Sequence, residues 1–171
     1  MKSTPQNTFN AAKAIDLDVR QALGPPEEGL HSNAQLVILR SIVRGTRGYI
    51  EKVANQVNGC YENGWYDACA VMIRRLIETL IIESFEKHSL ANKIKNPQGD
   101  FFYLRDLISS CLAETSWNLT RNCKQALPKL KDVGDKSAHS RRYVAQRGDI
   151  DPLIPDIRLV VQELTFLAGL K

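Results

Sequence analysis

Two short segments carry residue types from which a binding or catalytic site could be built. The first is Arg74-Arg75-Leu76-Ile77-Glu78, in which both arginines lie about one helical turn from Glu78. The second runs from Gly134 through Asp135 to His139, whose imidazole could move a proton near neutral pH. Ion pairs on a helix surface are common, but charges set among apolar side chains must be paired when buried. We therefore predict that Arg74 or Arg75 pairs with Glu78 inside the protein.

Basic residues are concentrated in segment 114–148. The segment has a net charge of +5, whereas the whole chain of 171 residues has +4. The candidates for contacts with nucleic-acid phosphates are Lys131, Lys136, Arg141, Arg142 and Arg147. A solvated helix face would explain the same charges. Tyr143 is the segment's only aromatic residue after Trp117, so we expect sequence-tolerant, salt-sensitive binding of single-stranded RNA without base-specific stacking.

Signatures of metal and cofactor sites are missing from the sequence. There is no glycine-rich phosphate loop, and the three histidines are scattered. The four cysteines have no zinc-knuckle spacing, and we interpret them as small apolar side chains of the core. We therefore predict no cofactor and no metal.

The apolar residues recur with helical spacing along most of the chain, and no alternating strand pattern appears. Helix 65–88 is apolar nearly all round, which is typical of the centre of a bundle. Pro128 is expected to interrupt a helix or to restart one in its first turn. The predicted helices are 9–23, 34–62, 65–88, 101–113, a helix starting at 117–126, a short helix restarted at Pro128, and 151–167.

These elements predict an all-α helical bundle of about five helices at 34–171, preceded by a lead-in segment at 1–33. The longest apolar stretch has six residues and no signal peptide is recognisable, so we expect a cytoplasmic protein without a membrane partner. The apolar circumference of helix 65–88 exceeds what one small bundle needs. We therefore also predict a homodimer.

The two motifs, in their order and separation, resemble a family of unknown function found in or beside restriction-endonuclease subunits. That family has Arg-x-x-Glu in a long apolar helix and, later, a Gly-Asn/Asp-x-x-Ala-His segment. It is grouped with the HEPN superfamily (higher eukaryotes and prokaryotes nucleotide-binding), and the resemblance covers roughly residues 36–170. It implies a HEPN-like bundle that often dimerises. Many superfamily members are metal-independent ribonucleases of toxin and phage-defence systems.

Carried over by position, His139 matches the histidine of the superfamily's catalytic motif and Asp135 its polar residue. Gly134 stands where the motif has an arginine, which would stabilise developing charge at the scissile phosphate. Lys131 or Lys136 could replace it only as a mobile point charge. The resemblance therefore supports the fold more than the activity.

Two classes of function stay open. One is a non-catalytic binding module, working with RNA or with a nucleic-acid-processing or defence protein. The other is a metal-independent ribonuclease that uses His139. His139 also has a structural interpretation, in which it pins a helix end or pairs with Glu78 or Asp67 in the core. An Arg or Lys within reach of the same site as His139 would distinguish the two classes.

Overall fold

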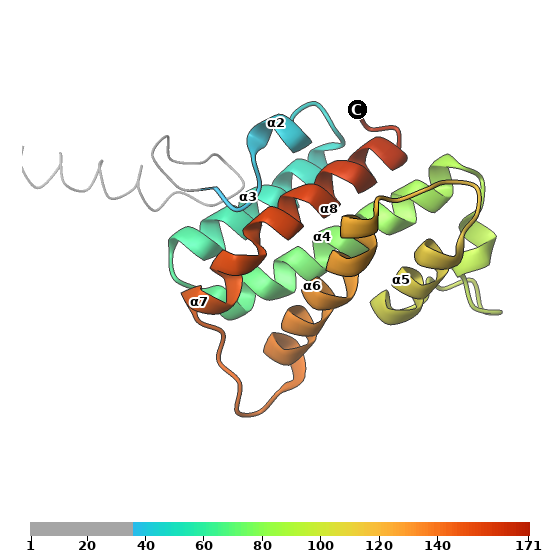
Figure 1. Ribbon diagram of the computed structural model, residues 1–171. Helices are drawn as coiled ribbons and strands as arrows, with labels where there is room; N and C mark the ends of the chain where they lie inside the picture. The colour runs from blue at the N-terminus through green and yellow to red at the C-terminus, as the bar shows by residue number, and fades with distance from the viewer. Residues whose placement is uncertain (1–35) are drawn as a thin grey trace, which may run out of the picture.

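Helices joined by short loops form residues 36–171, the part of the chain that the computed structural model describes, and no strand occurs in this range (Figure 1). The elements are α2 (Arg40–Val43), α3 (Gly48–Glu62), α4 (Tyr66–Lys87), η1 (Ala91–Ile94), α5 (Leu104–Ala113), α6 (Arg121–His139), α7 (Arg147–Ile150), η2 (Asp151–Leu153) and α8 (Ile154–Leu167). Five of these helices have ten residues or more. The predicted all-α bundle is confirmed for this range. The predicted lead-in segment 1–33, with its helix 9–23, lies outside the described residues.

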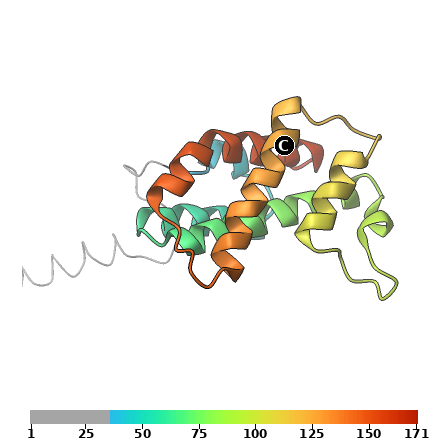
Figure 2. The same cartoon turned by 60° about the horizontal axis from the view of Figure 1, so that its bottom comes forward.

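Helix α4 is the centre of the bundle, as its apolar circumference predicts. Helices α3, α5, α6 and α8 all pack against it, and α6 crosses over it (Figures 1 and 2). Its side chains Leu76, Ile77, Leu80, Ile81 and Phe85 have no exposed surface. Burying each of them stabilises the fold by roughly 1.5–3 kcal/mol. Because neighbours within one chain cover this helix, its composition no longer argues for a homodimer.

The prediction of one helix over 34–62 is wrong, because its described part contains two helices, the short α2 and then α3. The chain turns at Gly45, whose φ of +80° lies in the left-handed region that glycine adopts without strain. The amide of Gly45 donates to a carboxylate oxygen of Glu51 at 2.6 Å, which fixes the turn to the next helix. The spacing of apolar residues continued through this break, so periodicity alone did not reveal it.

The prediction that Pro128 interrupts or restarts a helix is also wrong. Helix α6 runs through Pro128, which is exposed, and begins at Arg121 with Thr120 as its cap. A proline at this place cannot donate to the carbonyl of Lys124 one turn earlier. Leu127 and Leu130 are almost fully buried on either side of it. Their packing keeps the helix continuous despite the missing hydrogen bond.

The carboxylate of Glu83 in α4 is buried, with 6% of the residue exposed. Arg47 lies 3.2 Å from its Oε2, and the hydroxyl of Tyr49 donates to its Oε1. These partners meet the requirement that a buried charge be paired and hydrogen-bonded. The three residues fasten the start of α3 to the C-terminal part of α4.

Candidate nucleic-acid interface

Gly134 of α6 packs directly against α4. A Cβ atom at this position would lie 2.8 Å from Cβ of Arg74 and 3.2 Å from the carbonyl oxygen of Ala70. Such separations are below van der Waals contact, and neither atom is the free end of a flexible side chain. The position where the resembled motif has an arginine therefore has no room for any side chain.

The guanidinium of Arg74 lies beside this glycine and is held by carboxylates. Its Nε donates to Oδ1 of Asp135 at 2.9 Å, and its Nη1 lies 3.7 Å from Oε2 of Glu78. Lys131 approaches the other oxygen of Asp135 at 2.7 Å. Burial opposes ionisation of Asp135, but the hydrogen bonds from Lys131 and Arg74 outweigh it and lower its pKa. Two positive and two negative side chains thus balance each other between α4 and α6.

The predicted ion pair of Glu78 exists with Arg74 but is not buried. The side chains of Arg74 and Glu78 are 25% and 35% exposed. Arg75 is exposed, and none of the ion pairs within residues 36–171 includes it. The prediction of a pair inside the bundle is therefore wrong, because this face of α4 lies at the edge of the α4–α6 contact.

His139 is the last residue of α6 and is exposed. It does not pair with Glu78, whose carboxylate lies beside Arg74. It does not pair with Asp67 either, whose carboxylate accepts a hydrogen bond from the amide of Ala145. No hydrogen bond of its imidazole occurs within the described range. The interpretation of His139 as a core partner is wrong, because the helix carries it beyond the last contact with α4.

The cations that follow Pro128 in the basic segment fall into two groups. Lys129, Lys131 and Arg147 lie 3.6, 2.7 and 3.3 Å from the carboxylates of Asp156, Asp135 and Asp151, respectively. A second group is exposed and forms no ion pair within residues 36–171: Lys136, Arg141 and Arg142. Arg121 and Lys124, at the start of α6, are also exposed and form no ion pair within this range. Lys136, Arg141 and Arg142 are the ones that lie near His139, at the end of α6 and in the loop after it.

That loop, residues 140–146, is anchored at both ends. The amide of Ser140 donates to the carbonyl of Lys136 at 3.0 Å, and the amide of Ala145 donates to Oδ1 of Asp67 at 3.0 Å. Gln146 and Asp149 then form a capping box at the start of α7. Sequence reasoning missed the anchoring role of Asp67, since only the fold brings α4 next to this loop.

The cysteines have the role that the sequence predicts, except that Cys60 is half-buried. Burial raises the pKa of the thiols of Cys69, Cys111 and Cys123 to about 12, so these thiols stay protonated and unreactive at neutral pH. In the described part of the chain, no three His, Cys, Asp or Glu side chains gather as metal ligands would. The buried cysteines therefore add no reactive thiol to the candidate interface.

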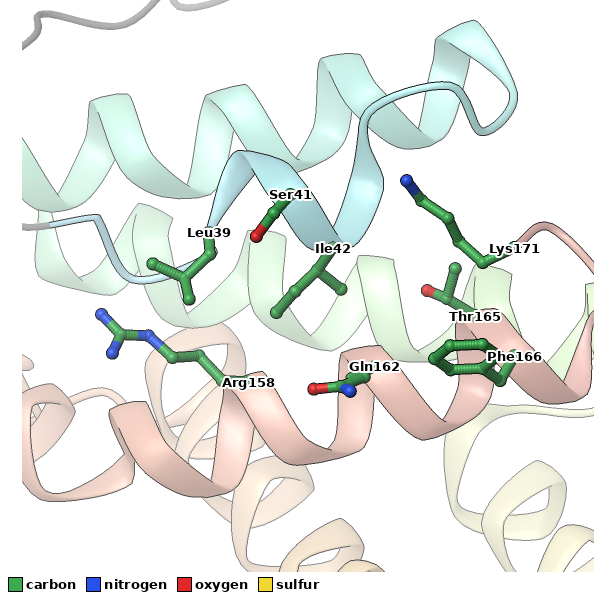
Figure 3. Close-up of a pocket in the computed structure, with 8 residues that line it drawn as sticks. All are labelled: Leu39, Ser41, Ile42, Arg158, Gln162, Thr165, Phe166 and Lys171. Atoms are coloured by element: carbon green, nitrogen blue, oxygen red, sulfur yellow. The ribbon is translucent and has the colours of Figure 1, made fainter.

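The surface also has a hollow of about 430 Å³ between α2 and α8 (Figure 3). Leu39 and Phe166 contribute exposed apolar surface to it. Its one arginine, Arg158, donates through Nε and Nη2 to the carbonyls of Val37 and Leu36. Because that guanidinium is already bound to the backbone, a ligand in the hollow would have to compete with these carbonyls for it.

None of the protein-family models, curated proteins and solved structures compared with this chain matches it. Within residues 36–171, no helix is both long enough and apolar enough to cross a membrane. The HEPN resemblance therefore depends on its two short motifs alone. The charges at the end of α6 are the best structural basis for a function.

Proposed function

We propose that the protein is a non-catalytic helical module that binds the phosphates of single-stranded RNA, alongside a nucleic-acid-processing or defence partner. One observation carries this proposal. Lys136, Arg141 and Arg142 are exposed together with His139 at one end of the bundle, without carboxylate partners in the described range. The C-terminus of α6 contributes only about −0.5 charge, which does not offset three cations.

The remaining candidates contribute less to this surface. The charges of Lys131 and Arg147 are largely neutralised by Asp135 and Asp151. A phosphate would have to compete with these carboxylates for the two cations. We therefore restrict the proposed RNA contacts to Lys136, Arg141 and Arg142, with His139 beside them.

The geometry around Gly134 favours binding over cleavage. A ribonuclease of the resembled kind needs a cation fixed near the histidine to stabilise the charge that develops on the phosphate, and losing such a group costs about 2.7–4 kcal/mol of barrier. Gly134 has no room for a side chain, and Arg74 is bound by Asp135 and Glu78. The exposed imidazole of His139 is the observation that favours the alternative, a metal-independent ribonuclease.

Fluorescence anisotropy of a labelled oligouridylate, measured between about 50 and 200 mM salt, tests the proposal. Replacing Arg141 and Arg142 together by Ala should weaken binding and flatten the log–log salt dependence by roughly 0.7 per lost phosphate contact. The control is Arg121→Ala with Lys124→Ala, which removes the same charge at the other end of α6. This control should leave the affinity nearly unchanged.

His139→Ala separates the two classes of function. A binding module should keep its RNA affinity in this variant, because the imidazole forms no contact that holds the fold in the described range. Efficient metal-independent cleavage of RNA by the wild-type protein, abolished by His139→Ala, would overturn the proposal and establish the ribonuclease. Absence of RNA binding at about 50 mM salt would overturn both RNA functions.

A further inference from the structure

Trp65 is an exposed aromatic residue at the start of α4. It immediately precedes the helix, and 59% of its surface is exposed. Its neighbours are arranged differently: Tyr61 and Tyr66 pack edge to face with ring centroids 5.8 Å apart. The indole of Trp65 therefore remains accessible to a partner from solution, with its hydrophobic face available for stacking.

The fold places this indole near the uncompensated cations. Asp67, two residues after Trp65, accepts the hydrogen bond from the amide of Ala145 at 3.0 Å. Arg142 is three residues before Ala145, a separation of at most about 11 Å along the chain. In both ribbon views, the loop from α6 reaches α7 beside the first turn of α4 (Figures 1 and 2). Trp65 and the basic loop thus belong to the same end of the bundle.

We infer that Trp65 stacks on a base of the RNA strand whose phosphates contact Lys136, Arg141 and Arg142. This inference rests on the proposed function and specifies its ligand as single-stranded, because a base inside a duplex has no free face. Every base has a π face, so stacking adds affinity without demanding a sequence. The sequence alone argued against base-specific stacking, since Tyr143 is the only aromatic residue of the basic segment after Trp117. The Asp67–Ala145 hydrogen bond, which brings the loop to the start of α4, exists only in the fold.

The experiment compares three variants by anisotropy of a labelled oligouridylate. Trp65→Ala should weaken binding by roughly 5- to 150-fold, the range for losing one base–aromatic stack, and Trp65→Phe should keep most of the affinity. Phe166→Ala is the matched control, because Phe166 has a similar exposed fraction, 60%, but lies on α8 beside the hollow of Figure 3. It should bind like the wild type.

Tryptophan emission gives a second measurement that a merely structural role would not change. The chain has two tryptophans, and Trp117 is half-buried against Phe85 and His88. RNA should quench the emission of the wild type, and Trp65→Phe should lose this quenching while it still binds. An oligonucleotide of abasic sites should neither quench nor discriminate between the wild type and Trp65→Ala.

The outcomes separate this inference from the function on which it rests. If Trp65→Ala binds like the wild type while the Arg141 and Arg142 double variant does not bind, the stacking inference is wrong and the proposed function stands. Equal affinity for a duplex of the same length would also overturn the stacking inference. If the wild type binds no RNA at about 50 mM salt, the proposed function fails, and the inference fails with it.

Discussion

Single residues decide the details of the α4–α6 contact, and Gly134 is the clearest case. The resembled motif has an arginine at this position. In the structure, atoms of α4 occupy the space that such a side chain would need. The side chain that lies there instead is Arg74, which belongs to the other helix and bonds to Asp135. Because Gly134 has no side chain, the side chain of Arg74 can pack against α6 at this point. Close packing of the two helices therefore explains the glycine.

Gly134→Ala should lower the free energy of unfolding by about 1–3 kcal/mol, the range for overpacking a filled contact. Gly148→Ala is the matched control, because nothing lies within 4 Å of its added Cβ and its φ is not positive. This control should be neutral or stabilising by up to about 1 kcal/mol. Urea unfolding of both variants measures the difference. Equal midpoints would show that α6 can move away from α4 without cost.

The ion pairs of Arg74 are unequal, because the pair with Asp135 is shorter than the predicted pair with Glu78. Glu78→Ala should cost less than about 1 kcal/mol, because this pair is 3.7 Å long and partly solvated. Asp135→Ala should cost more, about 1–2 kcal/mol, since it removes the acceptor of two short charge-assisted hydrogen bonds. Denaturant unfolding of the two variants checks the order. A loss of 3–5 kcal/mol for Glu78→Ala would instead indicate a buried pair.

At the scale of elements, helix packing overrides local preference. The interior proline of α6 costs the helix one backbone hydrogen bond, yet the buried side chains of Leu127 and Leu130 hold the helix together. The opposite happens at Gly45, where apolar spacing continues but the backbone turns. Tertiary contacts therefore determine where these helices continue or stop.

Pro128→Ala should stabilise the protein by about 1–3 kcal/mol, because alanine restores the donor to the carbonyl of Lys124 and suits a helix interior. Pro152→Ala serves as the comparison, since Pro152 lies in the first turn of η2, where its missing donor matters least. That variant should be neutral or slightly destabilised. Thermal unfolding shows whether each variant melts at a higher or a lower temperature than the wild type. A destabilised Pro128→Ala would contradict the explanation offered for α6.

The end of α5 is held by Glu114, whose pKa makes stability depend on pH. The hydrogen bond from Lys93 is the largest cause that lowers this pKa from 4.5 to about 2, and Ser116 adds to it. A lowered folded-state pKa gives stability that is present above about pH 5 and is lost as the pH falls from 4.5 toward 2. Glu114→Gln should flatten the fall in melting temperature over this range. Glu62→Gln, at an exposed carboxylate, should not.

At the scale of the whole molecule, one chain covers its own central helix. The apolar circumference of α4 therefore no longer supports the predicted homodimer. Other apolar side chains remain exposed, among them Trp65 and Phe166. The dimer stays a proposal that the oligomeric mass can test. A bundle whose core is closed within one chain can fold before it associates, so its stability depends on concentration only if the folded chains dimerise.

Light scattering at micromolar concentration measures that mass directly. A homodimer should give twice the 19.2 kDa of the chain. A mass near 19 kDa would contradict the homodimer, and it would leave the RNA-binding surface intact because that surface lies within one chain. Repeating the measurement with the oligouridylate separates dimerisation by the protein from bridging by RNA.

The sequence by itself determined the helical fold class and the position of α4 at its centre, because the apolar period and the apolar circumference are local properties of the chain. It also located the basic segment and the pair Arg74–Glu78, which are one turn apart. These inferences needed no knowledge of which helix packs against which.

Only the tertiary structure decided which of these charges are paired with carboxylates and which element holds the loop after α6. Asp156 neutralises Lys129 from another helix, and Asp67 holds the loop after His139 from the start of α4. The same fold filled the space at Gly134 with Arg74. Charge compensation and close packing depend on distances between segments far apart in the chain. Those distances exist only after the helices have packed.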